Sequence, residues 1–136
     1  MRSGVINKPM FIFWIEPYLA AGHCLYYHPN DLHAEYFDEL GLFKHNVISD
    51  NEYLNEHSNL TLSEAGCQTS FVPYSALNVK RFLAAILDTV CYSIQNQSTR
   101  STSYTWIGDL SVLKAQGIQL SPEMVNAQSF KLLCHQ

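Results

Sequence analysis

Charged residues are scarce in this chain of 136 residues: they make up 15% of the sequence, against 47% apolar residues. That balance excludes a disordered polypeptide, which needs abundant charge and few apolar side chains. Basic residues are especially few, eight against twelve acidic ones, and the net charge of −4 disfavours general binding to nucleic acid or to an anionic membrane. Two domains of usual size need more residues than this chain has, so we expect a single domain over residues 1–136.

Long hydrophobic runs are missing as well. The apolar run Met10–Ile15 ends at Glu16 and Pro17, which makes it shorter than the core of a secretory signal peptide. No window approaches the roughly 18 apolar residues that a membrane span needs. We therefore predict a cytoplasmic protein that has neither a membrane nor a nucleic acid as its partner.

The sequence also lacks the short motifs of phosphate-binding loops, nucleophile elbows and zinc proteases. His23, His28 and His33 are spaced by five residues, whereas metal-binding histidines on a helix lie three or four residues apart. We expect no metal, no cofactor and no catalytic residues, so the domain should fold without a metal and is predicted not to be an enzyme. The alternative is a small enzyme or ligand-binding protein that uses the region His23–His33.

Cysteines are few and widely separated. Cys24, Cys67, Cys91 and Cys134 form no CxxC pair, and a chain of this apolar content needs no covalent staple. We expect all four thiols to be free.

The strongest periodic element is a helix over about 76–94, which Ser75 can cap. Its middle is apolar nearly all round, which predicts a central position covered on several sides. We therefore predict a mainly α fold, a single compact domain around this helix. An α+β fold with a small sheet that includes residues 10–15 is the alternative.

Other local signals divide the rest of the chain. Helices are expected over 31–41, from the Ser49 capping box onward, and from Ser121-Pro122-Glu123 to the C-terminus. The polar stretch 95–103 predicts a loop between two structured parts. Residues 104–107 fit either a strand or a helix.

Negative charge is concentrated between residues 31 and 64, where eight acids and one base, Lys44, give a net charge of −7. The acids are Asp31, Glu35, Asp38, Glu39, Asp50, Glu52, Glu56 and Glu64. On a helix over 31–41 the first four would share one face, where like charges oppose each other and folding gains nothing. A solvated face would explain the pattern. A docking surface for a basic partner would explain it too, with Tyr36 and Tyr53 as anchors among the carboxylates.

A compact acidic domain with such an acidic-aromatic segment resembles, in general character, the small immunity proteins of bacterial toxin–immunity pairs, including those of contact-dependent growth inhibition systems. The resemblance is to the class and transfers no functional residue. It implies a non-enzymatic, cytoplasmic protein that neutralises a cognate toxin domain by covering its active site, and many such toxins are basic nucleases. An antitoxin-like inhibitor or an adaptor subunit would fit the same features. The partner-binding residues predicted from the segment are Asp31, Glu35, Asp38, Glu39, Asp50, Glu52, Glu56, Tyr36 and Tyr53.

Overall fold

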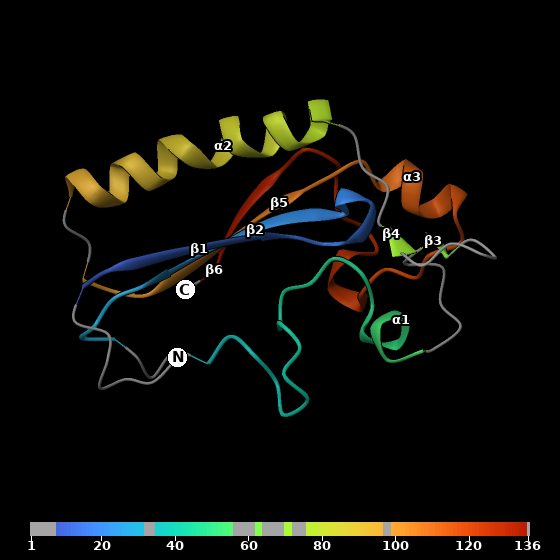
Figure 1. The fold of residues 1–136 in the computed structure, drawn as a ribbon, viewed down its shortest axis with the longest axis horizontal. Coiled ribbons are helices and arrows are strands. Elements are labelled where there is room, and N and C mark those ends of the chain that lie inside the picture. Colours follow the sequence, from blue (N-terminus) through green and yellow to red (C-terminus); the bar gives the residue numbers. More distant parts are fainter. Residues whose placement is uncertain are drawn as a thin grey trace.

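A computed structural model describes residues 8–31, 35–55, 62–63, 70–71, 76–96 and 99–135. Its centre is an antiparallel four-stranded sheet in the order β1-β2-β5-β6, with one long helix, α2, lying across one face (Figure 1). The prediction of a mainly α fold is therefore wrong, and a strand does occupy residues 10–15, where the alternative placed its sheet. The strands of this sheet are β1 (Met10–Ile15), β2 (Ala21–Tyr27), β5 (Thr102–Ile107) and β6 (Leu132–His135), and the helix across it is α2 (Ala76–Gln95).

The pairing of β1 with β2 decides which side chains face the helix. Phe13 lies opposite Cys24 and Trp14 opposite His23, across a connection that contains a 3-10 turn, η2 (Pro17–Leu19). Side chains alternate along a strand, so odd-numbered residues of β1 point toward α2 and even-numbered ones toward the other face. Phe11 accordingly packs in the cluster of α2, whereas Trp14 packs in a separate cluster on the other face.

The helix predicted over 76–94 is confirmed as α2, but it is not central. Only one side of it is buried, through Phe82, Ile86, Val90 and Ser93, because the sheet offers a single face to pack against. Gly22 lets the helix approach closely, since a Cβ atom there would lie 2.3 Å from the ring of Phe82. The rest of the helix surface keeps several large apolar side chains exposed: Leu77, Leu83, Leu87, Tyr92 and Ile94.

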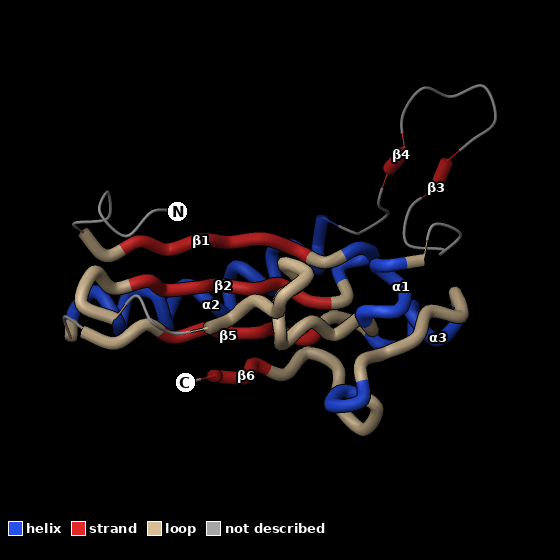
Figure 2. The backbone as a smooth tube through the Cα atoms, turned by 90° about the horizontal axis from the view of Figure 1, so that it is seen from below, coloured by secondary structure: helices blue, strands red, loops and turns tan. Residues whose placement is uncertain are grey.

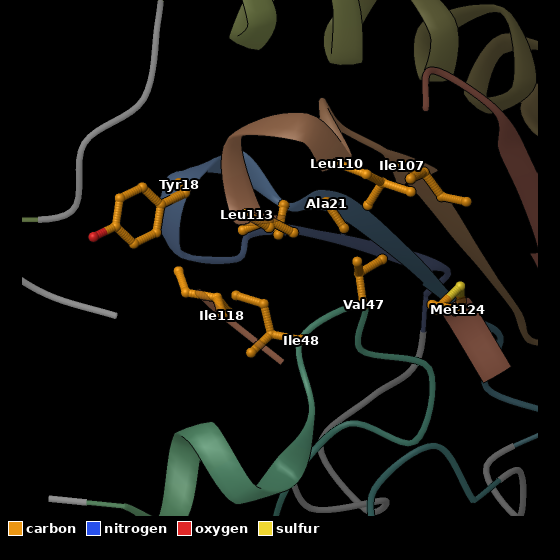
Figure 3. Packing of buried hydrophobic residues seen from close by; sticks show 10 residues of the cluster. Tyr18, Ala21, Val47, Ile48, Ile107, Leu110, Leu113, Ile118 and Met124 are labelled. Atoms are coloured by element: carbon orange, nitrogen blue, oxygen red, sulfur yellow. The ribbon is translucent and has the colours of Figure 1, made fainter. Parts of the chain in front are cut away.

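The other face of the sheet is covered by irregular chain and short helices. These are α1 (Asp50–Leu54), α3 (Leu110–Ala115) and the 3-10 turn η3 (Pro122–Met124). Val47 and Ile48 reach toward Ile107, Leu113 and their neighbours and fill a buried cluster there (Figure 3). Two-residue strands β3 (Leu62–Ser63) and β4 (Ser70–Phe71) pair in a second small sheet, seen at the upper right of Figure 2.

Ser49 caps α1 as its sequence predicted, because its side chain accepts a hydrogen bond from Asn51 N. The helix expected over 31–41 is wrong. Asp38 Oδ1 instead accepts hydrogen bonds from Leu40 N and Leu42 N, a local side-chain turn that competes with helix formation. Gly41 follows in the left-handed region, at a φ of 82°. The carboxylates of this stretch therefore do not share a helix face.

The helix expected from Ser121 to the C-terminus is wrong as well. Its start signal produces only the turn η3, and the chain then pairs with β5 as β6, where Leu132 lies opposite Trp106. Residues 104–107 belong to strand β5. The loop predicted over 95–103 is shorter than expected, because α2 extends to Gln95 and β5 begins at Thr102, and residues 97–98 between them lie outside the described part. No helix in the described part of the chain is long and apolar enough to cross a membrane.

Candidate functional site

A buried carboxylate, Glu16, fastens the acid-rich part of the chain to the sheet. Glu16 directly follows β1 and is 2% exposed. Its Oε2 accepts hydrogen bonds from His23 Nε2 at 2.7 Å and from Val47 N at 2.8 Å. Its Oε1 accepts from the Tyr53 hydroxyl at 2.7 Å and from Ile48 N at 3.0 Å. One side chain thus joins the hairpin β1–β2 to residues 47–53.

Polar contacts continue from His23 across the sheet. His23 Nδ1 lies 3.0 Å from Thr105 Oγ1, which in turn lies 3.1 Å from His135 Nε2. The His135 ring stacks on His45, with 3.7 Å between ring centroids. Burial, together with the nearby His45 and His23, lowers the pKa of His135 to about 4, and burial also lowers the pKa of His45. His45 and His135 are therefore uncharged at neutral pH, and the network joins β2, β5, β6 and the loop at His45.

The acid-rich stretch itself forms an exposed loop that displays apolar side chains. Phe37 is 43% exposed and Leu40 68% exposed, and both line a shallow depression of about 480 Å³. The Phe37 ring rests against Trp14 and Phe43, with centroids 6.4 and 5.6 Å away. Carboxylates form much of the remaining wall, and the described lining residues are Glu35, Phe37, Asp38, Glu39, Leu40 and Lys44.

Comparison of the chain with protein-family models, with curated proteins and with solved structures finds no match. No family therefore assigns a role to any residue, and the geometry has to carry the functional conclusion. We name the depression lined by Glu35, residues 37–40 and Lys44 the acidic-apolar depression. Lys44, the one cation among its described lining residues, lies 3.8 Å from Glu35, in an exposed ion pair of small energetic weight.

The structure places the predicted carboxylates in different surroundings. Glu35, Asp38 and Glu39 line the acidic-apolar depression. The Asp31 carboxylate accepts a hydrogen bond from Ser101 N. Part of its negative charge is therefore compensated inside the protein and is not offered to a partner. Asp50 lies exposed in the first turn of α1 and Glu52 Oε2 accepts from Gln119 N, while Glu56 lies outside the described residues.

The two tyrosines predicted as anchors contribute to the interior. Tyr36 is 5% exposed, and burial, with Asp31 and other neighbours, raises its pKa to about 12. Tyr53 packs against the cluster around Ile48 and donates its hydroxyl to Glu16, and burial raises its pKa far above the ordinary range. The exposed aromatic side chain of the segment is Phe37, which lies next to Tyr36 in sequence.

The two described histidines of the alternative site, His23 and His28, make separate contacts. His23 is fully buried against Glu16, His28 Nδ1 accepts a hydrogen bond from Asn30 N, and His33 lies outside the described residues. Across the described ranges, no group of three or more potential ligands could hold a metal ion. Of the cysteines, Cys24, Cys91 and Cys134 are free in the structure, and Cys67 falls outside the described part.

Sequence reasoning missed the role of Glu16, which was taken only as the end of an apolar run. A signal for it does exist. If residues 10–15 and 21–27 are taken as a hairpin, Glu16 and His23 become diagonal neighbours on one face, an acid and a base beside a strand pair. Phe37 and Leu40 were missed because a helix over 31–41 would place both, together with Leu32 and Tyr36, on one apolar stripe facing the core.

Proposed function

We propose that this protein is a non-enzymatic immunity or inhibitor protein of a bacterial cytoplasm, which binds a cognate basic toxin domain of the nuclease-like kind and neutralises it. The observation that supports this most is the acidic-apolar depression, where Phe37 and Leu40 are exposed between carboxylates. Protein interfaces draw most of their affinity from a few desolvated apolar or aromatic anchors. The surrounding charges set the rate and the choice of partner.

The charge around the depression suits a basic partner. Three carboxylates, Glu35, Asp38 and Glu39, and one cation, Lys44, line it in the described part of the chain, within a sequence segment, 31–64, whose net charge is −7. A local field of this kind raises the rate at which an oppositely charged protein arrives in the right orientation, by 10-fold or more at low salt. Toxins that act on nucleic acid are basic on the surface that they must keep free, so an acidic cover would block that surface.

The fold also holds the depression in place. The Phe37 ring packs against Trp14 and Phe43. Further along the chain, Val47 and Ile48 are held to the sheet by their hydrogen bonds to Glu16. A loop that is already ordered loses little conformational entropy when a partner binds. The site is therefore preorganised, as a fast and tight inhibitor requires.

Reversing the charge of Glu35 and Glu39 to lysine tests the electrostatic part, and Asp38 is kept because its carboxylate accepts the hydrogen bonds that shape the loop. We expect the association rate with the co-encoded toxin domain to fall at least about tenfold at low salt, with a smaller change in the dissociation rate, because exposed rim charges act mainly before contact. Surface plasmon resonance at several salt concentrations measures both rates. A matched pair of single variants, Glu39→Lys on the depression and Asp88→Lys on α2, separates local steering from the change in net charge.

Truncating the anchors tests the apolar part. Phe37→Ala and Leu40→Ala should raise the dissociation rate at least about tenfold and leave the association rate nearly unchanged, as expected for side chains that are desolvated in the complex. Val112→Ala, at an exposed apolar position on α3, is the control. Unchanged kinetics in both the lysine and the alanine variants would contradict the proposal and leave the acids as a solvated face.

A further inference from the structure

Strand β1 forms one edge of the sheet, no other described strand pairs with its outer side, and it carries no charge. It lies outermost in the order β1-β2-β5-β6, and its sequence, MFIFWI, contains no charged residue and no proline (Figure 2). Natural proteins usually protect an exposed edge strand with charges, prolines or a short length. The opposite edge, β6, is shorter, at four residues. Both strands have a proline or a charged residue directly beside them, Pro9 and Glu16 around β1 and Lys131 before β6, so its length makes β1 the less protected edge within the described residues.

The register shows which backbone groups face outward. Glu16 N donates to Ala21 O, so Glu16 faces β2, and in an antiparallel ladder this orientation alternates from residue to residue. The N–H and C=O groups of Phe11, Phe13 and Ile15 therefore point to the open edge. No backbone hydrogen bond from elsewhere in the described ranges reaches them. Their side chains point toward the α2 face, where Phe13 remains 42% exposed.

An apolar flank of α2 lies on the same side. Arg81 stacks on Phe130, which precedes β6, so this side of the helix faces the β6 edge. Around the helix axis, Leu83 and Leu87 point roughly half a turn away from Arg81. They therefore lie on the side of the helix that is nearer to β1. Both are exposed, at 39% and 49%, and Ile94 extends the flank at 61%. We call Phe13, Leu83, Leu87 and Ile94 the β1 strip.

We propose that two copies of this chain pair through β1, antiparallel and about a two-fold axis at Phe13, to form one continuous sheet. Centring on Phe13 pairs every outward-facing residue: Phe13 meets the partner's Phe13, and Phe11 meets the partner's Ile15. All of these cross-strand pairs are apolar, the kind that stabilises antiparallel strands. A second copy fits this edge better than a charged partner does, because the residues of the β1 strip are uncharged. Two identical strands that run antiparallel also present matching backbone donors and acceptors to each other.

The available area sets the strength of the dimer. A free side chain of this size exposes about 200 Å², so the four exposed fractions of the β1 strip correspond to roughly 400 Å² for each copy. Both copies together offer about 800 Å² of side-chain surface, to which the paired strands add their backbone. That total lies near the lower end of specific interfaces, about 1,200 Å². We therefore expect a dimer that forms in the micromolar range and dissociates on dilution.

Sedimentation velocity of the full chain from about 1 to 300 µM tests the pairing. The wild type should shift from monomer to dimer across this range. Phe13→Lys should raise the dissociation constant at least about tenfold, because two ammonium groups would face each other at the axis. Val112→Lys, which adds the same charge at 39% exposure on α3, should leave the constant within about twofold.

Circular dichroism melting shows whether Phe13→Lys still folds, and Leu87→Lys on α2 provides a second disruption of the β1 strip should it fail. A wild type that stays monomeric at 300 µM, or a dimer that neither variant weakens, overturns the proposal. A monomeric wild type whose toxin binding is lost in Phe13→Lys would assign the edge to a strand of the toxin, and this also overturns it. The pairing does not rest on the immunity function, since it is measured without any toxin.

Discussion

Replacing Glu16 by glutamine should destabilise the fold much more than the similar shapes of the two side chains imply. Each carboxylate oxygen accepts one hydrogen bond from a backbone N–H, Oε2 from Val47 and Oε1 from Ile48. A glutamine has only one oxygen, so its NH₂ group must face one of these two N–H groups in either orientation. The Tyr53 hydroxyl can rotate, and His23 can change its tautomer, but a backbone N–H has no such freedom.

The size of the effect follows from the buried position. A buried N–H left without an acceptor costs about 1–3 kcal/mol, and a hydrogen bond to a charged group contributes about 1.5–3 kcal/mol. Since Glu16 is 2% exposed and His23 fully buried, water cannot replace the lost partner. We expect Glu16→Gln to lower the free energy of unfolding by about 3–5 kcal/mol, which combines one lost hydrogen bond to the carboxylate with one buried N–H left without an acceptor. That is a large part of the 5–15 kcal/mol typical of a domain.

Urea unfolding followed by tryptophan fluorescence measures this, because the Trp14 ring lies 5.1 Å from that of His23. Tyr53→Phe removes a single donor from the same carboxylate and should cost about 1–2 kcal/mol. Glu39→Gln, the same change at an exposed position, should stay within about 0.5 kcal/mol. A Glu16→Gln variant within about 1 kcal/mol of wild type, at an unchanged slope in urea, would refute the donor geometry described here.

Two further predictions concern the histidine stack and the contact between helix and sheet. His135 has a folded-state pKa of about 4, below its ordinary value near 6.5, so the unfolded chain binds the extra proton and stability should fall as the pH drops from about 6.5 to 4. His135→Gln should flatten this slope in urea midpoints taken between pH 7 and 4, and an identical slope would show that the ring titrates normally. Gly22→Ala should cost about 1–3 kcal/mol, since its Cβ would lie 2.3 Å from Phe82. Chemical unfolding of Gly22→Ala in a Phe82→Leu background should show a smaller loss, and strict additivity would contradict this contact.

Local signals in the sequence predicted several elements well. The long helix over residues 76–94 and the Ser49 cap both depend on neighbours within one or two turns, and the structure has both. The position of the helix could not be derived from its own sequence. Leu83, Leu87 and Ile94 look like core residues, yet they are exposed because a single sheet covers only one side of the helix. Burial on the remaining sides depends on partners that helical periodicity does not specify.

The failures at 31–41 and after Ser121 have one cause in common. In both places a contact that the expected helix would not allow takes the chain elsewhere. Phe37 bridges to Phe43 in the first case, and Leu132 pairs with Trp106 in the second. Propensity is a weak guide wherever strand pairing competes with it. The Glu16 network was hidden for the same reason, because Val47 and Ile48 approach Glu16 from more than thirty residues away.

The irregular loop changes the meaning of the concentrated charge. On a helix, Phe37 and Leu40 would have faced the core and left an outer face of carboxylates alone, which solubility would explain. In the observed loop both side chains lie exposed in the same depression as Glu35, Asp38 and Glu39. Single exposed apolar residues are common on protein surfaces. Two of them within four residues, one of them resting on Trp14 and both beside the carboxylates of Glu35, Asp38 and Glu39, are the observation on which we propose a docking surface with apolar anchors and a charged rim. A solvated face would tolerate polar residues at 37 and 40, whereas a docking surface requires these two apolar side chains.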